Sequence, residues 1–295
     1  MQPGSSISEL TSGGRYKKLE KAVRLFETSC ANPMTETNFE ATSPKKHRSR
    51  VGIAFHRLGS PPYFYALAGK LVPWVGGLSA LFFAYSLYAG LVIAPTDYEQ
   101  GESFRIIYVH VPSAWLSMLV YAILAACGAI SLIWRMKLAE SLARACAPIG
   151  ASYTFLALVT GSIWGKPMWG TWWVWDARLT SELVLLFLYL GYIALQSSFS
   201  DRRTASRASA ILALIGVVNL PIIHYSVDWW NTLHQGATIL KANAPSIHPS
   251  MLIPLLIMVL AFHLHFFTVA LMRIRCEILE DEKRTHWVQQ LDTNR

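Results

Sequence analysis

The sequence predicts an all-α integral membrane protein with six transmembrane helices, and three observations support this. Of the 295 residues, 53% are hydrophobic and only 15% are charged, so apolar surface must face lipid as well as a core. Several apolar stretches approach the roughly 20 residues that a helix needs to cross a bilayer core of about 30 Å. Basic residues gather in the polar connections on one side of these stretches, as is typical of cytoplasmic loops.

The six expected spans are residues 71–94, 112–134, 148–164, 183–199, 208–223 and 251–272. The third, fourth and fifth are short, which suits helices that pack inside the bundle or tilt little. An even number of spans places both termini on one side of the membrane, and the basic clusters predict that this side is the cytoplasm. Three connections are then expected on the opposite, outer side of the membrane: residues 95–111, 165–182 and 224–250.

The predicted organisation has one membrane domain between two cytoplasmic tails. Residues 1–58 are rich in Ser, Thr, Gly and charge without a sustained apolar period, which predicts a disordered tail. Residues 59–275 hold the six helices, and residues 276–295 form the second tail. The net charge of +8 is distributed over the connections between apolar stretches, which favours a membrane orientation signal over a surface for nucleic acid.

Two prolines suggest where the outer helix ends lie. Pro112 suits the first turn of the second helix, where its missing amide donor costs nothing, so His110 is expected just outside that helix. Pro221 is expected to bend the end of the fifth helix and to leave His224 at the same depth.

The most distinctive segment reads WGTWWVWDAR over residues 169–178, and Trp164 lies just before it. An interfacial aromatic belt is the ordinary explanation for tryptophan near a membrane boundary. A belt should decorate both faces, however, and the distribution is one-sided. On the predicted outer side lie Trp115, Trp164, Trp169, Trp172, Trp173, Trp175, Trp229 and Trp230, against Trp74, Trp134 and Trp287 on the inner side.

These indoles predict a platform for a flat apolar ligand with charged edges. If each stacked indole covers about 100 Å² at about 25 cal/mol per Å², it contributes on the order of 2.5 kcal/mol, and two or three such contacts approach micromolar affinity. Haem has this shape, and Arg105, Lys166 and Arg178 are candidates to pair with its propionates. No CxxCH motif for covalent haem attachment is present.

Histidines are the candidate ligands for the haem iron, because a neutral imidazole is a common axial ligand. His110 and His224 come from different predicted helices at matching depths, as two ligands on opposite faces of one iron require. His234 and His248 fall in the middle of a predicted loop without such anchoring, so they are secondary candidates.

Three carboxylates near these histidines are expected to be partners rather than catalysts. Asp176 is expected to fix Arg178 or a loop amide, and Asp228 to orient a histidine. Thr180 or Ser181 is expected to cap the fourth helix, with Glu182 in its first turn. No nucleophile and base triad, phosphate-binding glycine loop or ATP motif is visible, so we expect no independent enzymatic activity, and any ATP hydrolysis must come from a partner.

The WWD segment resembles the signature of the haem-handling proteins of cytochrome c maturation, and the chain is similar to the haem exporter protein C family over about residues 60–275. Further matching segments are RIIYVHVPSAW, PIGASYTFLALVTGSIWGKPMWG, LTSELVLLFLYLGYIALQ and IGVVNLPIIHYSVDWWNTLHQG.

This resemblance implies a multi-pass protein of the bacterial inner membrane that takes part in haem transport for c-type cytochrome biogenesis. It implies six spans, a periplasmic WWD loop at residues 165–182, and His110 and His224 as the two axial ligands of haem b. Residues 169–178 would hold the haem with a vinyl edge exposed. The family works with an ATP-binding-cassette transporter of maturation proteins A and B and with the small protein D, and it delivers haem to the periplasmic chaperone, maturation protein E.

Three alternatives remain at this stage. A membrane electron-transfer subunit of the cytochrome b type would also pair histidines, but it would bury them within helices and bind two haems, whereas only one outer pair is well formed here. His263 and His265 lie in the sixth span, where helix packing explains polar residues as well as function does. A scaffold or permease that binds no haem would use the indoles as interface anchors alone. The haem lyase of the same pathway is a longer chain with more spans.

Overall fold

The computed structural model describes residues 60–293, apart from residues 235 and 237–246. The predicted tail at residues 1–58 lies outside the described residues. The chain divides into two compact units. One unit comprises residues 71–274, and the other comprises residues 1–70 together with residues 275–295.

The described part of the chain contains six helical segments that are long and apolar enough to cross a membrane. They are Pro61–Ile93, Glu102–Trp134, Lys137–Trp169, Ala177–Ser198, Arg202–Trp229 and Pro249–Asp281. The predicted all-α architecture with six spans is therefore confirmed.

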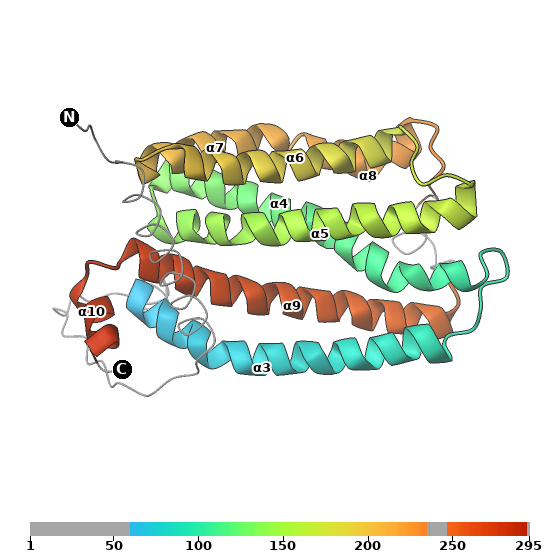
Figure 1. Ribbon diagram of the computed structural model, residues 1–295, viewed down its shortest axis with the longest axis horizontal. Helices are drawn as coiled ribbons and strands as arrows, with labels where there is room; N and C mark the ends of the chain where they lie inside the picture. Colours follow the sequence, from blue (N-terminus) through green and yellow to red (C-terminus); the bar gives the residue numbers. More distant parts are fainter. Residues whose placement is uncertain (1–59, 235, 237–246, 294–295) are drawn as a thin grey trace, which may run out of the picture. The chain divides into compact units, whose positions relative to one another are not determined.

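The described residues form eight α-helices and two short helical turns, and all of these except α10 lie in the six segments (Figure 1). The α-helices are α3 (Pro61–Tyr88), α4 (Ile107–Trp134), α5 (Lys137–Trp169), α6 (Ala177–Ser198), α7 (Arg202–Gly216), α8 (Asn219–Trp229), α9 (Pro249–Asp281) and α10 (His286–Thr293). A π-helical turn, Ala89–Ile93, extends α3, and a 3-10 turn, Glu102–Ile106, leads into α4.

The prediction of short third, fourth and fifth spans is wrong. Helix α5 has 33 residues and α6 has 22, while α7 and α8 together cover 28 residues. Helices α5 and α7 begin with polar residues that lie before the apolar run. The apolar run alone therefore underestimates the length of these helices. Asp201 also caps α7, since its side chain accepts hydrogen bonds from the backbone N–H groups of Arg203 and Thr204.

Both prolines lie at different helix positions from those predicted. Pro112 is the sixth residue of α4 rather than part of its first turn, so His110 lies inside the helix. The Ser113 hydroxyl donates to the carbonyl oxygens of Val109 and His110 at 2.8 and 2.9 Å, a common contact of a serine inside a helix. Pro221 is the third residue of α8, where a proline is tolerated, so it starts this helix instead of bending its end.

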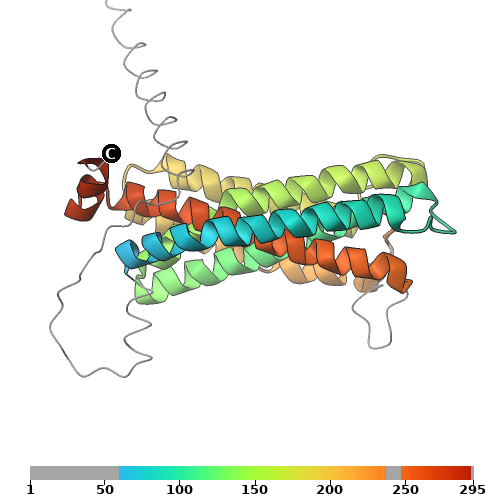
Figure 2. The same ribbon diagram turned by 90° about the horizontal axis from the view of Figure 1, so that it is seen from below.

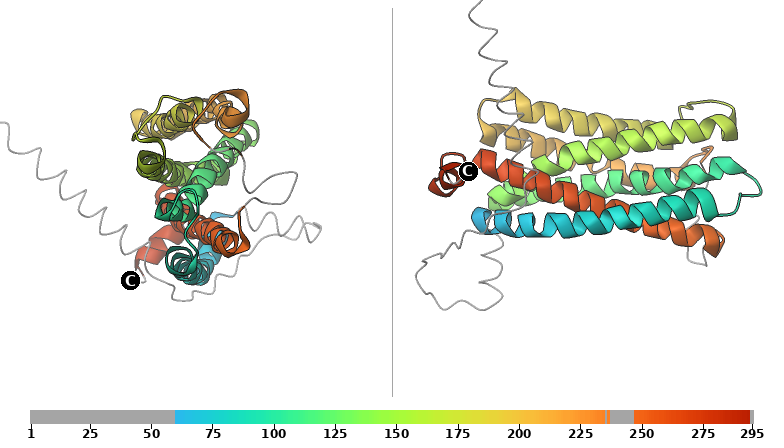
Figure 3. Two further views of the ribbon diagram at one scale, coloured as in Figure 1. Left: turned by 90° about the vertical axis from the view of Figure 1, so that its right-hand side faces the viewer. Right: turned by 60° about the horizontal axis from the view of Figure 1, so that its bottom comes forward.

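Within the unit of residues 71–274, the helices run alongside one another as neighbouring pairs (Figures 2 and 3). Helix α3 lies beside α9, and the Ser79 hydroxyl donates to the Ala261 carbonyl oxygen at 3.1 Å. Helix α4 lies beside α5, and α6 lies beside the α7 and α8 pair. This arrangement brings the amino-terminal ends of α4 and α6 and the carboxyl-terminal ends of α5 and α8 to one end of the bundle.

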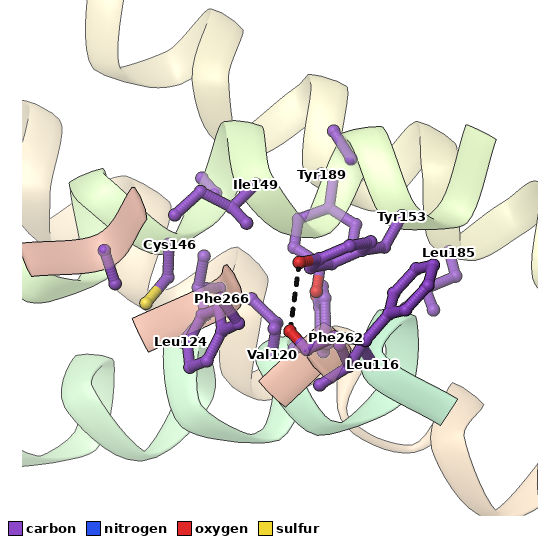
Figure 4. Close-up of a cluster of buried hydrophobic side chains, with 14 of the residues drawn as sticks. Leu116, Val120, Leu124, Cys146, Ile149, Tyr153, Leu185, Tyr189, Phe262 and Phe266 are labelled. Carbon is purple, nitrogen blue, oxygen red and sulfur yellow. Dashed lines mark hydrogen bonds between the residues drawn. The ribbon is translucent and has the colours of Figure 1, made fainter. Parts of the chain in front are cut away.

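The core of this unit lies where α4, α5, α6 and α9 meet (Figure 4). Leu116, Val120 and Leu124 form a stripe with helical spacing on α4, and each is fully buried. Across from them, the Tyr189 hydroxyl donates to the Ser117 carbonyl oxygen at 2.8 Å. The ring of Tyr189 also fits against Gly150 of α5 at a distance that leaves no room for a side chain.

The described part of the other unit includes the final turns of α9 and helix α10. The Arg275 guanidinium lies 4.5 Å from the centre of the Tyr65 ring, and Trp287 packs against the same ring with centroids 5.8 Å apart. Helix α9 ends at Asp281. The predicted tail at residues 276–295 therefore begins inside a helix.

Candidate functional site

The loop between α5 and α6 is much shorter than predicted. Helix α5 continues to Trp169 and α6 begins at Ala177, which leaves residues 170–176, here called the α5–α6 loop, instead of residues 165–182. Gly170 ends α5 in the left-handed conformation with a φ of 76°, which glycine adopts at little cost. Some of the tryptophans lie in α5 and others in the loop. Their spacing in the sequence therefore does not show where α5 ends.

Asp176 caps α6, and the predicted caps Thr180 and Ser181 are wrong. The Oδ1 atom of Asp176 accepts a hydrogen bond from the Leu179 backbone N–H at 2.8 Å, as an N-cap side chain does. The Ser181 hydroxyl instead donates to the Ala177 carbonyl oxygen at 2.6 Å. The aspartate of the WWD segment therefore fixes where the loop ends and α6 begins.

Trp169 folds back on its own helix. A Cβ atom at Gly165 would lie 2.9 Å from the Trp169 ring and 3.3 Å from the Thr171 carbonyl oxygen, so a larger residue would displace either the indole or the loop. Thr171 in turn donates its hydroxyl to the Trp173 carbonyl oxygen at 3.1 Å. The glycine and the threonine together shape this end of the WWD segment.

His110 is held by α5 in a defined orientation. Its Nδ1 atom lies 3.1 Å from both the Ala157 carbonyl oxygen and the Thr160 Oγ1 atom. Because Thr160 donates its own hydroxyl to the Leu156 carbonyl oxygen at 2.7 Å, both contacts with His110 require a proton on Nδ1. The neutral ring then keeps a lone pair on Nε2, which is the state a metal ligand needs.

The His110 ring also contacts Trp164, which connects it to the segment between α3 and α4. The two rings meet edge to face with centroids 5.6 Å apart. The Trp164 Nε1–H donates to Gln100 Oε1 at 3.1 Å. Gln100, Ala157 and Thr160 were not among the predicted site residues. Glutamine, alanine and threonine are not residue types that indicate a haem site. Their contacts with His110 and Trp164 can be recognised only once it is known which helix faces meet.

Gly161 leaves the His110 ring its space. A Cβ atom at Gly161 would lie 3.0 Å from His110 Cε1, so Gly161→Ala is expected to displace the imidazole by a few tenths of an ångström. If His110 binds haem iron, we expect this variant to fold normally and to weaken haem binding about tenfold, as is typical when a supporting contact is lost. A haemin titration followed by absorption spectroscopy measures this, with Gly77→Ala as control. Equal affinities would contradict the prediction.

His224 lies on the exposed face of α8, beside a row of aromatic rings. Its ring meets that of Tyr225 with centroids 4.7 Å apart, and Tyr225 stacks on Trp229 at 5.3 Å. Trp230 continues the row. His224 makes no hydrogen bond or ring contact with His110 in the described residues, so their pairing on one iron stays a prediction.

His234 is anchored, contrary to expectation. Its Nδ1 atom lies 3.2 Å from Asp176 Oδ2, and its ring meets that of Trp169 with centroids 4.9 Å apart. Burial lowers the pKa of His234 from its ordinary value, although the neighbouring Asp176 carboxylate opposes this shift. A neutral imidazole whose Nδ1–H donates to the carboxylate satisfies both groups. The hydrogen-bond partners of Asp176 are therefore His234 and the Leu179 amide, while Arg178 interacts with this carboxylate through charge.

The two arginines predicted to meet propionates both lie close to carboxylates of the protein. Arg105 pairs through Nε with Glu102 Oε2 at 2.5 Å, and its Nη1 donates to the Gly90 carbonyl oxygen at 2.8 Å. Partly buried Arg178 experiences the charges of three carboxylates, those of Glu182, Asp176 and Asp228. A haem propionate at either arginine would therefore compete with carboxylates of the protein.

Glu182 is the sixth residue of α6 and points into the bundle, so the prediction that it lies in the first turn of this helix is wrong. Its Oε1 accepts a hydrogen bond from the Ser117 hydroxyl at 2.7 Å, and its side chain is buried.

Lys166, in the last turn of α5, donates to the Gly170 carbonyl oxygen at 3.1 Å and lies 5.9 Å from the centre of the Trp172 ring.

The indoles of the α5–α6 loop differ in their surroundings. Trp172 and Trp175 are 57% and 77% exposed, whereas Trp173 is half-buried and its rings meet those of Trp175 at 5.5 Å. The buried Nε1–H of Trp173 has no hydrogen-bond partner among the described residues. An unpaired buried donor of this kind costs about 1–3 kcal/mol, so the loop offers both exposed aromatic faces and one unused donor.

The arrangement combines an oriented imidazole, a second exposed histidine and open indole faces at one end of a helical bundle. These features define a multi-pass α-helical membrane protein with an aromatic, histidine-containing site between the ends of its helices. The model of the family "Heme exporter protein C" matches residues 54–289. The chain therefore belongs to the haem exporter protein C family.

Curated relatives agree with this assignment. The chain is 56% identical over 236 residues to "Heme exporter protein C" of Escherichia coli (strain K12), which covers 80% of this chain and 95% of that protein. The protein of the same name from Haemophilus influenzae is 50% identical, with coverage of 80% and 96%. That from Bradyrhizobium diazoefficiens is 48% identical, with coverage of 81% and 89%. With its six spans, the chain is a multi-pass protein of the bacterial inner membrane.

Proposed function

We propose that this protein binds haem b at the periplasmic face of the inner membrane and transfers it to the periplasmic haem chaperone, maturation protein E. Membership of its family implies involvement in haem export for cytochrome c biogenesis. The finer assignment depends on one observation above the others. His110 is fixed through Nδ1 by Ala157 and Thr160, so that Nε2 keeps its lone pair.

His110 and His224 are the proposed axial ligands. They come from α4 and α8, so they can approach one iron from different sides, and neutral imidazoles suit haem iron. When bound, the iron porphyrin supplies the redox-active metal and the reactive vinyl edge. The protein's own part is to hold the two imidazoles in place and to shield the apolar ring from water.

The aromatic residues are proposed to cover the faces of the macrocycle. Trp172 and Trp175 expose large apolar surfaces, and covering them with a flat apolar ligand is favourable. Arg105 and Arg178 are proposed to pair with the propionates, in exchange for part of their present carboxylate contacts. The unpaired Trp173 Nε1–H is a further donor for such a group.

The proposed partners follow from the family and from the absence of an ATP motif in the sequence. The ATP-binding-cassette transporter of maturation proteins A and B would supply the energy, with the small protein D as a further subunit. Both termini of the chain are proposed to lie in the cytoplasm. The haem is cargo that passes on to the chaperone.

The test is to purify the full chain with these partners from haem-replete cells and to add the chaperone. We expect one haem per chain with the absorption bands of low-spin bis-imidazole iron, and a covalent haem–chaperone adduct after incubation. A chaperone that lacks its acceptor histidine serves as control and should stay unloaded. A colourless complex would contradict haem binding, and a coloured complex that loads no chaperone would contradict the transfer step.

The alternative of an electron-transfer subunit of the cytochrome b type needs ligands deep in the bundle. The two histidines there already have side-chain partners. His265 Nδ1 lies 2.7 Å from the Tyr153 hydroxyl, and His263 Nε2 accepts a hydrogen bond from Trp115 at 3.3 Å. Two haems per chain in the purified complex would favour this alternative, whereas one haem that is lost with His110 would exclude it.

A further inference from the structure

We infer that His234 and Asp176 form a loop clasp, a hydrogen bond that holds the α5–α6 loop in its haem-binding conformation. His234 is then a positioning residue that acts through Trp169 and Asp176, and not an iron ligand. This inference rests on the proposed function, because it assigns a role in haem retention.

Asp176 uses its two carboxylate oxygens for two different tasks. Oδ1 accepts from the Leu179 N–H at 2.8 Å and caps α6, while Oδ2 lies 3.2 Å from His234 Nδ1. The Asp176 side chain is 8% exposed and that of His234 is 16% exposed. A hydrogen bond to a carboxylate is stronger than one between neutral groups. Its loss would leave the buried Oδ2 atom of Asp176 without the donor that His234 supplies.

The clasp connects two segments that are far apart in the sequence. His234 belongs to the segment that follows α8, and its backbone N–H donates to Thr232 Oγ1 at 2.9 Å, which shapes the chain at this point. The His234 ring packs edge to face on Trp169, the last residue of α5. The clasp therefore holds both ends of the α5–α6 loop, Trp169 through ring packing and Asp176 through the hydrogen bond.

The surroundings of His234 favour positioning over ligation. A haem iron lies at the centre of a wide macrocycle, so a second axial imidazole has to project into open space. His224 is exposed on α8, whereas the His234 ring is largely buried against Trp169. A buried imidazole that orients neighbouring groups through a carboxylate is a typical supporting arrangement at metal sites.

The first measurement uses the full chain with its partners in lipid nanodiscs, loaded with haemin. Haem dissociation is followed by capture with excess apomyoglobin. We expect His234→Ala to release haem about tenfold faster than the wild type, in line with the loss of a supporting contact at a metal site. Its spectrum should stay low-spin, because both ligands remain. His234→Gln should regain most of the retention, since its amide can donate to Asp176.

The matched control is His248→Ala, which removes the next histidine of the same outer segment. His248 Nδ1 contacts the Ser250 hydroxyl at 2.8 Å and has no contact with the α5–α6 loop among the described residues. We expect its haem dissociation rate to equal that of the wild type. A general effect of removing an outer histidine would appear in both variants.

The second measurement needs no haem. Hydrogen–deuterium exchange at residues 170–176 of the haem-free protein should be faster in His234→Ala than in the wild type. Asp176→Ser keeps a cap for α6 but lacks the second oxygen for His234. We expect this variant to speed exchange and haem release to a similar extent, and the double variant to add little to either single change.

Each outcome decides a different point. A high-spin spectrum in His234→Ala would make His234 a ligand and overturn the inference. Unchanged exchange and unchanged haem release would also overturn it. If the wild type binds no haem, the proposed function fails, while the exchange measurement still decides whether the clasp orders the loop.

Discussion

Replacing His110 by alanine is expected to lower haem affinity at least about 100-fold, since losing a ligand should cost more than the 10–100-fold typical of losing a supporting residue. The reason is that two contacts from α5 hold the Nδ1 atom of His110, which fixes the ring and leaves the lone pair of Nε2 for the iron. Haem content per chain in the purified complex measures the effect, and production of c-type cytochromes provides a second readout.

Two comparisons separate ligand loss from general damage. Thr160→Val removes one contact to His110 Nδ1 but leaves the Ala157 carbonyl oxygen, so we expect a loss of about tenfold. His263→Ala removes a histidine of α9 that contacts Trp115, and haem content should stay unchanged. A His110→Ala variant that keeps low-spin bis-imidazole bands would show that another histidine provides the ligand.

His224→Ala is expected to leave haem bound through a single imidazole, with a change from low-spin to high-spin absorption. His224 is exposed and has no hydrogen bond that orients it in the described structure, so its coupling to the rest of the site is weaker than that of His110. Imidazole added to the buffer should restore the low-spin bands by occupying the vacated position. An unaltered spectrum without added imidazole would remove His224 from the ligand set.

The second large effect is expected at Gly150, where α5 packs on α6. A Cβ atom there would lie 2.1 Å from Tyr189 Cζ. The Tyr189 ring is fully buried, its hydroxyl donates to the Ser117 carbonyl oxygen, and its face is contacted edge-on by Tyr121. It therefore has nowhere to move, and Gly150→Ala should destabilise the fold by about 3 kcal/mol, the upper part of the usual range for overpacking.

Thermal unfolding in detergent, followed by circular dichroism, measures this change. Gly77→Ala is the matched control, since a Cβ atom at Gly77 of α3 meets nothing within 4 Å, and alanine favours helix over glycine. Tyr189→Leu should relieve the clash and recover part of the stability of Gly150→Ala. If Gly150→Ala unfolds at the wild-type temperature, the close packing of α5 on Tyr189 is not present in the membrane protein.

The hydrophobic pattern was sufficient for the number of spans but not for their ends. The apolar runs located all six helices. Their ends depended on contacts that a run of apolar residues does not encode, as in α5, which starts at Lys137 and continues to Trp169. Pro221 illustrates the same point, because a proline is compatible with either end of a helix until its neighbours are placed.

Residue types in the sequence suggest candidate site residues, but not the contacts between them. The tryptophans, His110 and His224 could be selected from residue types and their concentration on one side. The partner of Asp176 could not be selected, because His234 lies 58 residues away and only the folded chain brings the two together. The same holds for Thr160 and Gln100, whose roles depend on which faces of α4 and α5 meet.

By itself, the sequence determined the class of the protein, its six spans and the concentration of tryptophan and histidine in the connections on one side of these spans. These properties follow from composition and local periodicity, which set the energy of each segment in lipid. Only the tertiary structure decided which nitrogen of His110 is occupied, which group Asp176 binds and where the α5–α6 loop begins and ends. A hydrogen bond depends on the positions of both partners to within a few tenths of an ångström, and helix packing alone sets those positions.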